Sequence, residues 1–252
     1  MGIYDRSLLL LGENVSKRLS ELKVLIFGIG GVGSWCVESL VRSGVTHITM
    51  VDSDCISESN VNRQLMATSK NIGRPKVEVM RERLLEINPE ASIEISTERY
   101  SEQTADSFHL ESYDYIIDAI DSLKDKSSLI LRACRSGAVF FCSMGAALKV
   151  DPCLVKEAEF WNVRGCPLAA AIRKKYKREK TYPSHNFRCV YGEQVLPNLG
   201  FDALPSASVT ASDGHACVNG SLSHITGIFG LTLAGLVIKD VYNKTLNPEL
   251  SE

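Results

Sequence analysis

Residues 23–44 read KVLIFGIGGVGSWCVESLVRSG, and this stretch decides the fold. It opens with an apolar run, residues 24–27, that is typical of a buried strand. Glycines follow at once in the pattern G-x-G-G-x-G, and they are Gly28, Gly30, Gly31 and Gly33. A helical stretch begins directly behind them, so that a phosphate can approach the main chain and face the start of the helix. The order of strand, glycine loop and helix predicts a β–α unit that binds a nucleotide.

Strands and helices alternate on the C-terminal side of this unit. Further strands are expected in residues 47–52, 91–96, 113–121 and 138–145, and helices in residues 74–87 and 126–137. After about residue 150 the pattern loosens, with a helix expected in 166–180, a strand in 185–191 and a last helix in 219–242. The alternation predicts an α/β protein with a doubly wound, mainly parallel, Rossmann-like sheet and an elaborated C-terminal part.

Composition is that of an ordinary globular protein. The 252 residues are 44% hydrophobic and carry a net charge of −2, so contact with nucleic acid would need a local basic patch. The eight cysteines contain no C-x-x-C pair and the N-terminus lacks the pattern of a secretory signal, so we expect free thiols in the cytoplasm. The longest apolar stretch, residues 225–238, has 14 residues against the about 20 that span a bilayer. We therefore expect a buried helix and no integral membrane association.

Charged side chains after the predicted strands distinguish between ATP and NAD. Asp52 ends the second strand, where an acid that binds ribose is expected. NAD needs only this acid, whereas Asp54, Arg63 and Lys76 suit a triphosphate whose negative charge must be screened. Asp121 ends the fourth strand and suits a Mg²⁺ ion. Taken singly, Arg63 could be an ordinary surface arginine, Lys76 an ordinary lysine at a helix start and Asp121 a helix cap. Their arrangement around one glycine loop favours ATP.

Motifs spread over residues 4–145 resemble the ubiquitin-activating superfamily, whose bacterial members include ThiF, MoeB and the TcdA group. The motifs are YDRSLLLLG, GIGGVGS, VDSD, NVNRQ, GRPKVE, INPE and DAID. The resemblance implies a single ThiF/MoeB-type adenylation domain over residues 1–252. Residues 1–150 would form the nucleotide-binding core, and residues 151–252 the part for substrate binding and dimerisation. The shared chemistry is adenylation, in which a carboxylate attacks the α-phosphate of ATP and pyrophosphate leaves.

The resemblance also implies roles for individual residues. Asp52 would bind the ribose, with the loop glycines beside the phosphates. The triphosphate would be surrounded by Asp54, Asn62, Arg63, Gln64 and Lys76. Arg63, Lys76 and Asp121 are the expected catalytic residues, and Asp121 would hold Mg²⁺. Arg6 matches an arginine that reaches the ATP of the partner subunit, which implies a homodimer.

The second half of the chain indicates which substrate carboxylate is activated. CPLAAAIRKKYKR, VYGEQ and NGSLSHITGIFGLTLAG resemble the TcdA group, the tRNA threonylcarbamoyladenosine dehydratases, although Cys166 stands where that group usually has aspartate. The resemblance implies that ATP adenylates the carboxylate of the modified adenosine, whose ureido group then closes a ring and expels AMP. The alternative is activation of a small carrier protein through a cysteine such as Cys189 or Cys217. An NAD-dependent oxidoreductase and a non-catalytic scaffold fit the ATP-type residues less well.

A concentrated basic run suits contact with tRNA. Residues 173–180 read RKKYKREK and hold six basic residues in eight, among them Arg173, Lys174, Lys175 and Lys177. Phosphate contact is one interpretation and a solvated helix end is the other. Cys217, beside His215, is either a loop thiol or a sulfur acceptor for a partner such as a cysteine desulfurase. His224 either lines the site or packs against the protein.

Overall fold

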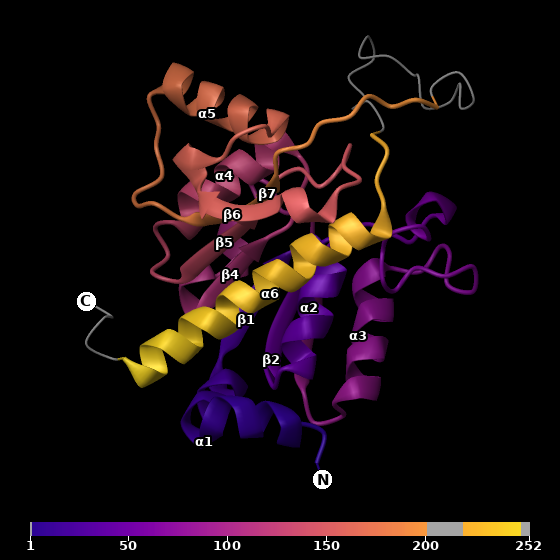
Figure 1. Cartoon of the computed structure of the whole chain (residues 1–252), viewed down its shortest axis with the longest axis vertical. Coiled ribbons are helices and arrows are strands. Elements are labelled where there is room, and N and C mark those ends of the chain that lie inside the picture. Colours follow the sequence, from indigo (N-terminus) through magenta and orange to yellow (C-terminus); the bar gives the residue numbers. More distant parts are fainter. Residues whose placement is uncertain (1, 201–218, 248–252) are drawn as a thin grey trace.

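The computed structural model describes residues 2–200 and 219–247. Strands and helices alternate along the chain (Figure 1). The strands are β1 (Lys23–Phe27), β2 (His47–Val51), β3 (Ser92–Ser96), β4 (Tyr115–Asp118), β5 (Val139–Ser143), β6 (Val155–Glu159) and β7 (Arg188–Gly192). The α-helices are α1 (Asp5–Glu21), α2 (Gly33–Arg42), α3 (Lys76–Ile87), α4 (Leu123–Ala133), α5 (Pro167–Glu179) and α6 (Ser223–Leu246).

The strands form one seven-stranded sheet in the order β3-β2-β1-β4-β5-β7-β6. Every neighbouring pair is parallel except β6 and β7. The expected α/β fold with a mainly parallel sheet is confirmed, and the second half of the chain extends the same sheet. The strand order reverses beside β1, which pairs with β2 on one side and β4 on the other. Ligands of such sheets bind at this point, beyond the carboxyl ends of the strands.

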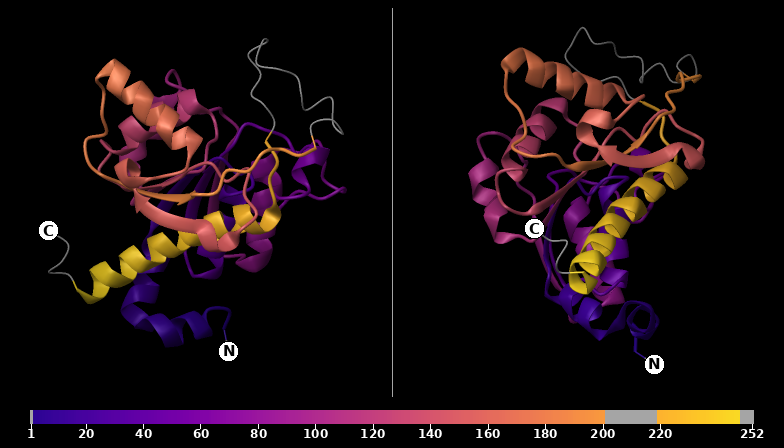
Figure 2. Two further views of the ribbon diagram at one scale, coloured as in Figure 1. Left: turned by 45° about the horizontal axis from the view of Figure 1, so that its top comes forward. Right: turned by 60° about the vertical axis from the view of Figure 1, so that its left-hand side comes forward.

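Helices cover both faces of the sheet (Figure 2). On one face, side chains of α1, α2, α3 and α6 pack against inward-facing residues of β1 and β2, such as Ile26 and Met50. On the other face, α4 and α5 pack against residues such as Leu25 and Phe140. Side chains alternate between faces along a strand, so a core on each side requires the continuous apolar runs that the sequence has here.

The last helix, α6, lies across α2 and the sheet (Figure 1). It begins at Ser223, after the glycine with which we expected it to begin. The expectation that this segment is too short to span a membrane is wrong, because α6 has 24 residues and sufficient hydropathy. Its most apolar window is nevertheless 56% buried inside the protein, as in the core helix of a soluble protein. Gly227 and Gly230 allow the close approach, since both face Trp35 of α2.

The cysteines in the described residues are free, as expected. Most are buried like small apolar side chains, and these are Cys36, Cys134, Cys142, Cys166 and Cys189. Cys189 lies on β7, between β5 and β6, with no exposed surface, so it is unsuited to attack a carrier protein. Cys217 and His215 lie outside the described residues.

Candidate active site

The glycine loop joins β1 to α2 at the carboxyl edge of the sheet. Gly28 has a φ of 86°, and a Cβ there would lie 2.7 Å from the carbonyl oxygen of Ala119. A Cβ at Gly33 would lie 1.9 Å from the Gly28 carbonyl oxygen, so both positions require glycine. At Gly30 the nearest atom is the amide nitrogen of Gln64, at 3.8 Å. The loop is therefore tightly folded at its ends and open at Gly30, where a phosphate can approach the main chain.

Two carboxylates and an ammonium group lie beside the loop. Asp52 Oδ2 accepts a hydrogen bond of 2.7 Å from the main-chain N–H of Ile29, which ties the carboxylate to the loop. Lys76 Nζ lies 2.7 Å from Asp54 Oδ2 and 3.9 Å from Asp52 Oδ1. Burial raises the pKa of Asp52, while the charge of Lys76 acts in the opposite direction. Lys76 begins α3, where a cation is unfavourable, and these acids offset that cost.

Asn62, Arg63 and Gln64 follow a short 3₁₀-helix, η1 (Glu58–Asn60), and reach the other side of the loop. Arg63 Nη1 donates to the carbonyl oxygen of Ser59 at 2.8 Å and to Asn62 Oδ1 at 2.9 Å. Gln64 is buried, and its Oε1 has no hydrogen-bond partner. A buried acceptor without a donor is costly, so this position suits a ligand that brings an N–H or O–H group. The hydroxyl and amino groups of ATP fit that requirement.

The position of Asp121 differs from the expected one. The strand β4 ends at Asp118, and Asp121 is an exposed residue of the following turn. The expectation that Asp121 closes the strand is therefore wrong. The charge of Asp121 is felt at Arg99: the pKa of Arg99 is raised first by a hydrogen bond to Asp125 and the charge of Asp125, and further by the charges of Asp54 and Asp121. Asp54, which follows β2, and Asp121, which follows β4, thus both act on the charge of Arg99. The sequence analysis had not identified this arginine.

A buried ion pair lies under that turn. Asp118 Oδ1 is 2.8 Å from Lys126 Nζ, and neither side chain has any exposed surface. Burial would lower the pKa of Lys126, but the charge of Asp118 outweighs it and raises that pKa. Asp118 Oδ1 also accepts a hydrogen bond of 2.9 Å from the Ile120 N–H, and Cys142 Sγ donates to Oδ2 at 3.4 Å. The pair therefore fixes the turn that carries Asp121.

The donor set at this edge is compatible with Mg²⁺ bound through phosphate. Within residues 2–200 and 219–247, no group of three or more His, Cys, Asp or Glu side chains is placed to hold a metal ion. Mg²⁺ at nucleotide sites usually takes only one or two carboxylates and completes its shell with phosphate oxygens and water. Asp121, an exposed carboxylate just beyond β4, meets that smaller requirement.

Arg6 lies at the opposite edge of the sheet from the loop. It is exposed in the first turn of α1. Tyr4, two residues earlier, donates a hydrogen bond of 2.9 Å to the carbonyl oxygen of Val41, near the end of α2. The glycine loop adjoins the other end of that helix, about 15 Å away at 1.5 Å per residue. Arg6 therefore does not reach the glycine loop of its own chain.

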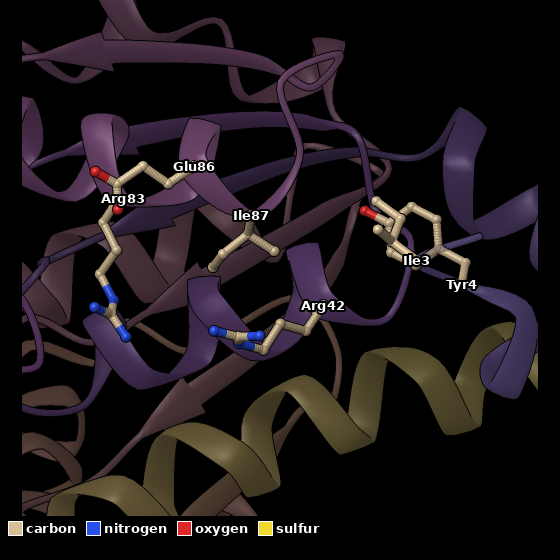
Figure 3. A pocket seen from close by; sticks show the side chains of 6 residues that line it. All are labelled: Ile3, Tyr4, Arg42, Arg83, Glu86 and Ile87. Carbon is tan, nitrogen blue, oxygen red and sulfur yellow. The ribbon is translucent and has the colours of Figure 1, made fainter. Parts of the chain in front are cut away.

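A cavity of about 480 Å³ opens at this same far edge. Its lining comes from the N-terminal segment and the ends of α2 and α3, namely Ile3, Tyr4, Arg42, Arg83, Glu86 and Ile87 (Figure 3). Both arginines already bond to Glu38. The cavity is separate from the residues grouped around the glycine loop.

The basic run lies on α5, and its four predicted RNA-contacting side chains are not equivalent. Arg173 Nη1 donates to the carbonyl oxygen of Phe160 at 2.9 Å, and Lys175 Nζ donates to Ser127 Oγ at 2.6 Å. Both are half-buried and serve to attach α5 to the protein. Lys174 and Lys177 are exposed. The run therefore offers fewer free cations than its sequence suggests.

The start of α6 and the residues just before it contact the glycine loop and Asn62. Asn62 Nδ2 donates to the carbonyl oxygen of Ser221 at 3.0 Å, and the methyl group of Thr226 packs against Gly31. His224 is exposed, and its Nε2 lies 2.9 Å from the carbonyl oxygen of Val150. This contact with the main chain favours packing over a place in the site for His224. The first turn of the C-terminal helix thus packs directly against the glycine loop.

Comparison with known proteins agrees with this geometry. The ThiF family description matches residues 4–251. A tRNA threonylcarbamoyladenosine dehydratase of Bacillus subtilis is 36% identical over 94% of this chain and 94% of its own length. The enzyme of the same name from Haemophilus influenzae is 34% identical over 90% and 88%. The solved structure of E. coli tRNA N6-threonylcarbamoyladenosine dehydratase, TcdA, in complex with ATP is 28% identical, has a TM-score of 0.84 and covers 96% of this chain and 95% of its own. With a matching family description and relatives that share nearly its whole length, the chain belongs to the ThiF family.

Proposed function

We propose that the chain dehydrates N6-threonylcarbamoyladenosine beside the anticodon of tRNA, using ATP. The observation that carries the proposal is the likeness over nearly the whole chain to dehydratases of that name, one of them solved with ATP. The glycine loop, the cations Arg63 and Lys76, and the acids Asp52 and Asp54 lie together at the carboxyl edge of the sheet. That combination suits ATP better than a nicotinamide cofactor.

The triphosphate of ATP is the proposed partner of the free N–H groups at Gly30 and the start of α2. Lys76 pairs with Asp54 in the present structure, and we propose that ATP phosphate oxygens share its ammonium group when ATP binds. Arg63, held by Asn62, contributes a second cation, and the unpaired Oε1 of Gln64 would accept a hydrogen bond from a hydroxyl or amino group of the nucleotide. Asp52 is the proposed ribose ligand. Mg²⁺ would be held by Asp121 and would screen phosphate charge.

The proposed reaction balances without a covalent enzyme intermediate. The substrate carboxylate oxygen attacks the α-phosphorus of ATP, pyrophosphate leaves, and an acyl-adenylate forms. The ureido group of the same substrate then attacks the acyl carbon, loses one proton and expels AMP, which keeps one former carboxylate oxygen. Because the ring closure is intramolecular, proximity and orientation supply most of the rate enhancement for this step. No cysteine nucleophile is required.

A homodimer is part of the proposal. Arg6 does not reach the loop of its own chain, and Leu9 and Leu10 beside it are 84% and 81% exposed. Exposed apolar side chains of this size are typical of interfaces. We propose that a second chain covers them and that Arg6 acts on the nucleotide of that chain. The roles of residues 1–150 and 151–252, the cytoplasmic location and a sulfur-transfer partner stay predictions.

The test is incubation of the protein with ATP, Mg²⁺ and tRNA that carries threonylcarbamoyladenosine with an ¹⁸O-labelled carboxylate. We expect the nucleoside to lose one water and one ¹⁸O atom to appear in AMP. Lys76→Ala and Arg63→Ala should each reduce AMP formation by about two powers of ten or more, the scale for loss of a phosphate-clamping cation. An unchanged nucleoside, with AMP formed only when a small carrier protein is added, would support the alternative of carrier activation.

The exposed part of the basic run is the proposed contact with tRNA. Charge reversal of Lys174 and Lys177 together should weaken tRNA binding and reduce its dependence on salt concentration. Lys17→Glu on α1 is the matched control, because Lys17 is also an exposed lysine of a helix. Equal tRNA affinity of the double variant and the wild type at low and high salt would remove this surface from the proposal.

A further inference from the structure

The main chain of Arg63 is held by a side chain from another element. Trp35 Nε1 donates a hydrogen bond of 3.3 Å to the carbonyl oxygen of Arg63. Trp35 lies on the first turn of α2, directly behind the glycine loop. An indole has one donor, and Trp35 directs it to a residue 28 positions further along the chain.

Trp35 is itself fixed from the other side. Its ring lies against Gly227 of α6, where a Cβ would be 3.6 Å from the ring atoms. Thr226, in the first turns of α6, has its hydroxyl 3.5 Å from the same Arg63 carbonyl oxygen. The Arg63 carbonyl therefore lies between α2 and α6, and the stem of Arg63 comes within 3.4 Å of a Cβ built on Gly31.

The guanidinium of Arg63 is restrained as well. It donates to Ser59 and Asn62, and Asn62 in turn donates to Ser221 just before α6. Two of these restraints involve Nη1, so the other N–H groups of the five in a guanidinium stay available. Arg63 thus has a fixed main chain, a fixed stem and free donors, which is the arrangement that electrostatic catalysis requires.

We infer that Trp35 is a positioning residue that sets Arg63 over the glycine loop for the ATP that binds there. The inference rests on the proposed function for the identity of the nucleotide. Trp35 touches no reacting atom and acts through the Arg63 main chain. Its loss should therefore matter only while Arg63 is present to be positioned.

A double-mutant cycle tests this dependence. Trp35→Phe keeps a ring against Gly227 and removes the N–H donor. Loss of one neutral hydrogen bond corresponds to a factor of about 3 to 10, so kcat and the affinity for a non-hydrolysable ATP analogue should fall by that factor. In the Arg63→Ala background the same substitution should change neither quantity. Trp161→Phe, at a half-buried tryptophan far from the loop in sequence, is the matched control and should leave both unchanged.

The outcomes separate this inference from the proposed function. Binding of the ATP analogue needs no tRNA, so the cycle can be read even if the modified tRNA proves not to be the substrate. An equal loss from Trp35→Phe with and without Arg63 would show a general structural effect and overturn the inference. So would wild-type affinity and kcat in Trp35→Phe. Thermal unfolding of each variant, measured without nucleotide, detects any loss of folding separately.

Discussion

Gly230→Ala tests whether α6 must touch α2. The glycine lies where the two helices cross, and a Cβ there would be 2.4 Å from the Val32 carbonyl oxygen and 2.8 Å from the Cys36 N atom. These are main-chain atoms of α2, so they cannot rotate away as a flexible side chain could. The added methyl group therefore forces α6 to shift, together with Thr226, which packs on the glycine loop.

Two opposing terms give the magnitude. Overpacking of this kind costs about 1–3 kcal/mol, and the contacts at Gly230 place it at the upper end. Alanine in place of glycine within a helix returns about 1 kcal/mol. The net expectation is a destabilisation of about 2 kcal/mol, which corresponds to a fall in Tm of roughly 4–8 °C for a chain of this size.

Gly235→Ala is the matched control on the same helix. Nothing lies within 4 Å of a Cβ at Gly235, so only the helix-propensity gain of about 1 kcal/mol applies and stability should rise. Urea denaturation and thermal unfolding of both variants give the two numbers. Titration with an ATP analogue adds a second readout, in which only Gly230→Ala should weaken binding. Equal stability of the two variants would refute the close packing of α6 on α2.

Other expectations concern buried charges. Burial alone would raise the pKa of Glu38, but hydrogen bonds from Arg83 and Arg42 outweigh burial and lower that pKa. The ionised Glu38 therefore stabilises the folded protein above about pH 4.3, and this stability is lost as pH falls through the pKa that Glu38 has in the folded protein. Glu38→Gln should therefore be less stable than the wild type at neutral pH, and the difference in denaturant unfolding should shrink as pH falls below about 4.3; a constant difference would contradict this. Lys126→Met leaves Asp118 unpaired and should cost about 3–5 kcal/mol of unfolding free energy, much of which Asp118→Asn in the same chain should restore. If the double variant is no more stable than Lys126→Met, the ion pair is not the cause.

The sequence was informative wherever the pattern is local. The apolar run, the glycines and the helix of residues 23–44 predict their own structure, because each follows from spacing and backbone geometry over a few residues. Lys76 begins α3 as predicted, and Asp52, predicted as the last residue of the second strand, directly follows β2, which ends at Val51. The alternation of such units was enough to predict a parallel sheet.

The sequence was less informative where burial decides between like residues. DAID offers Asp118 and Asp121 equally, and only the buried Lys126 shows which acid turns inward. The basic run on α5 looks like a uniform patch in the sequence, yet Ile172 and Tyr176 are buried, and Arg173 and Lys175 next to them bond to the protein. A helical wheel centred on Ile172 and Tyr176 contains this signal, but the identity of the partners, such as Ser127, does not follow from it.

The contact between Trp35, Arg63 and the first turns of α6 could not be predicted, because it joins residues up to 163 positions apart. The nucleotide loop comes from the first 50 residues, whereas the helix that confines Arg63 beside it comes from the last 30. A chain cut near residue 150 would keep the glycine loop and lose both Thr226 and the helix behind Trp35. By our proposal α5 contacts tRNA while α6 confines Arg63, so both contacts depend on the part of the chain after residue 150.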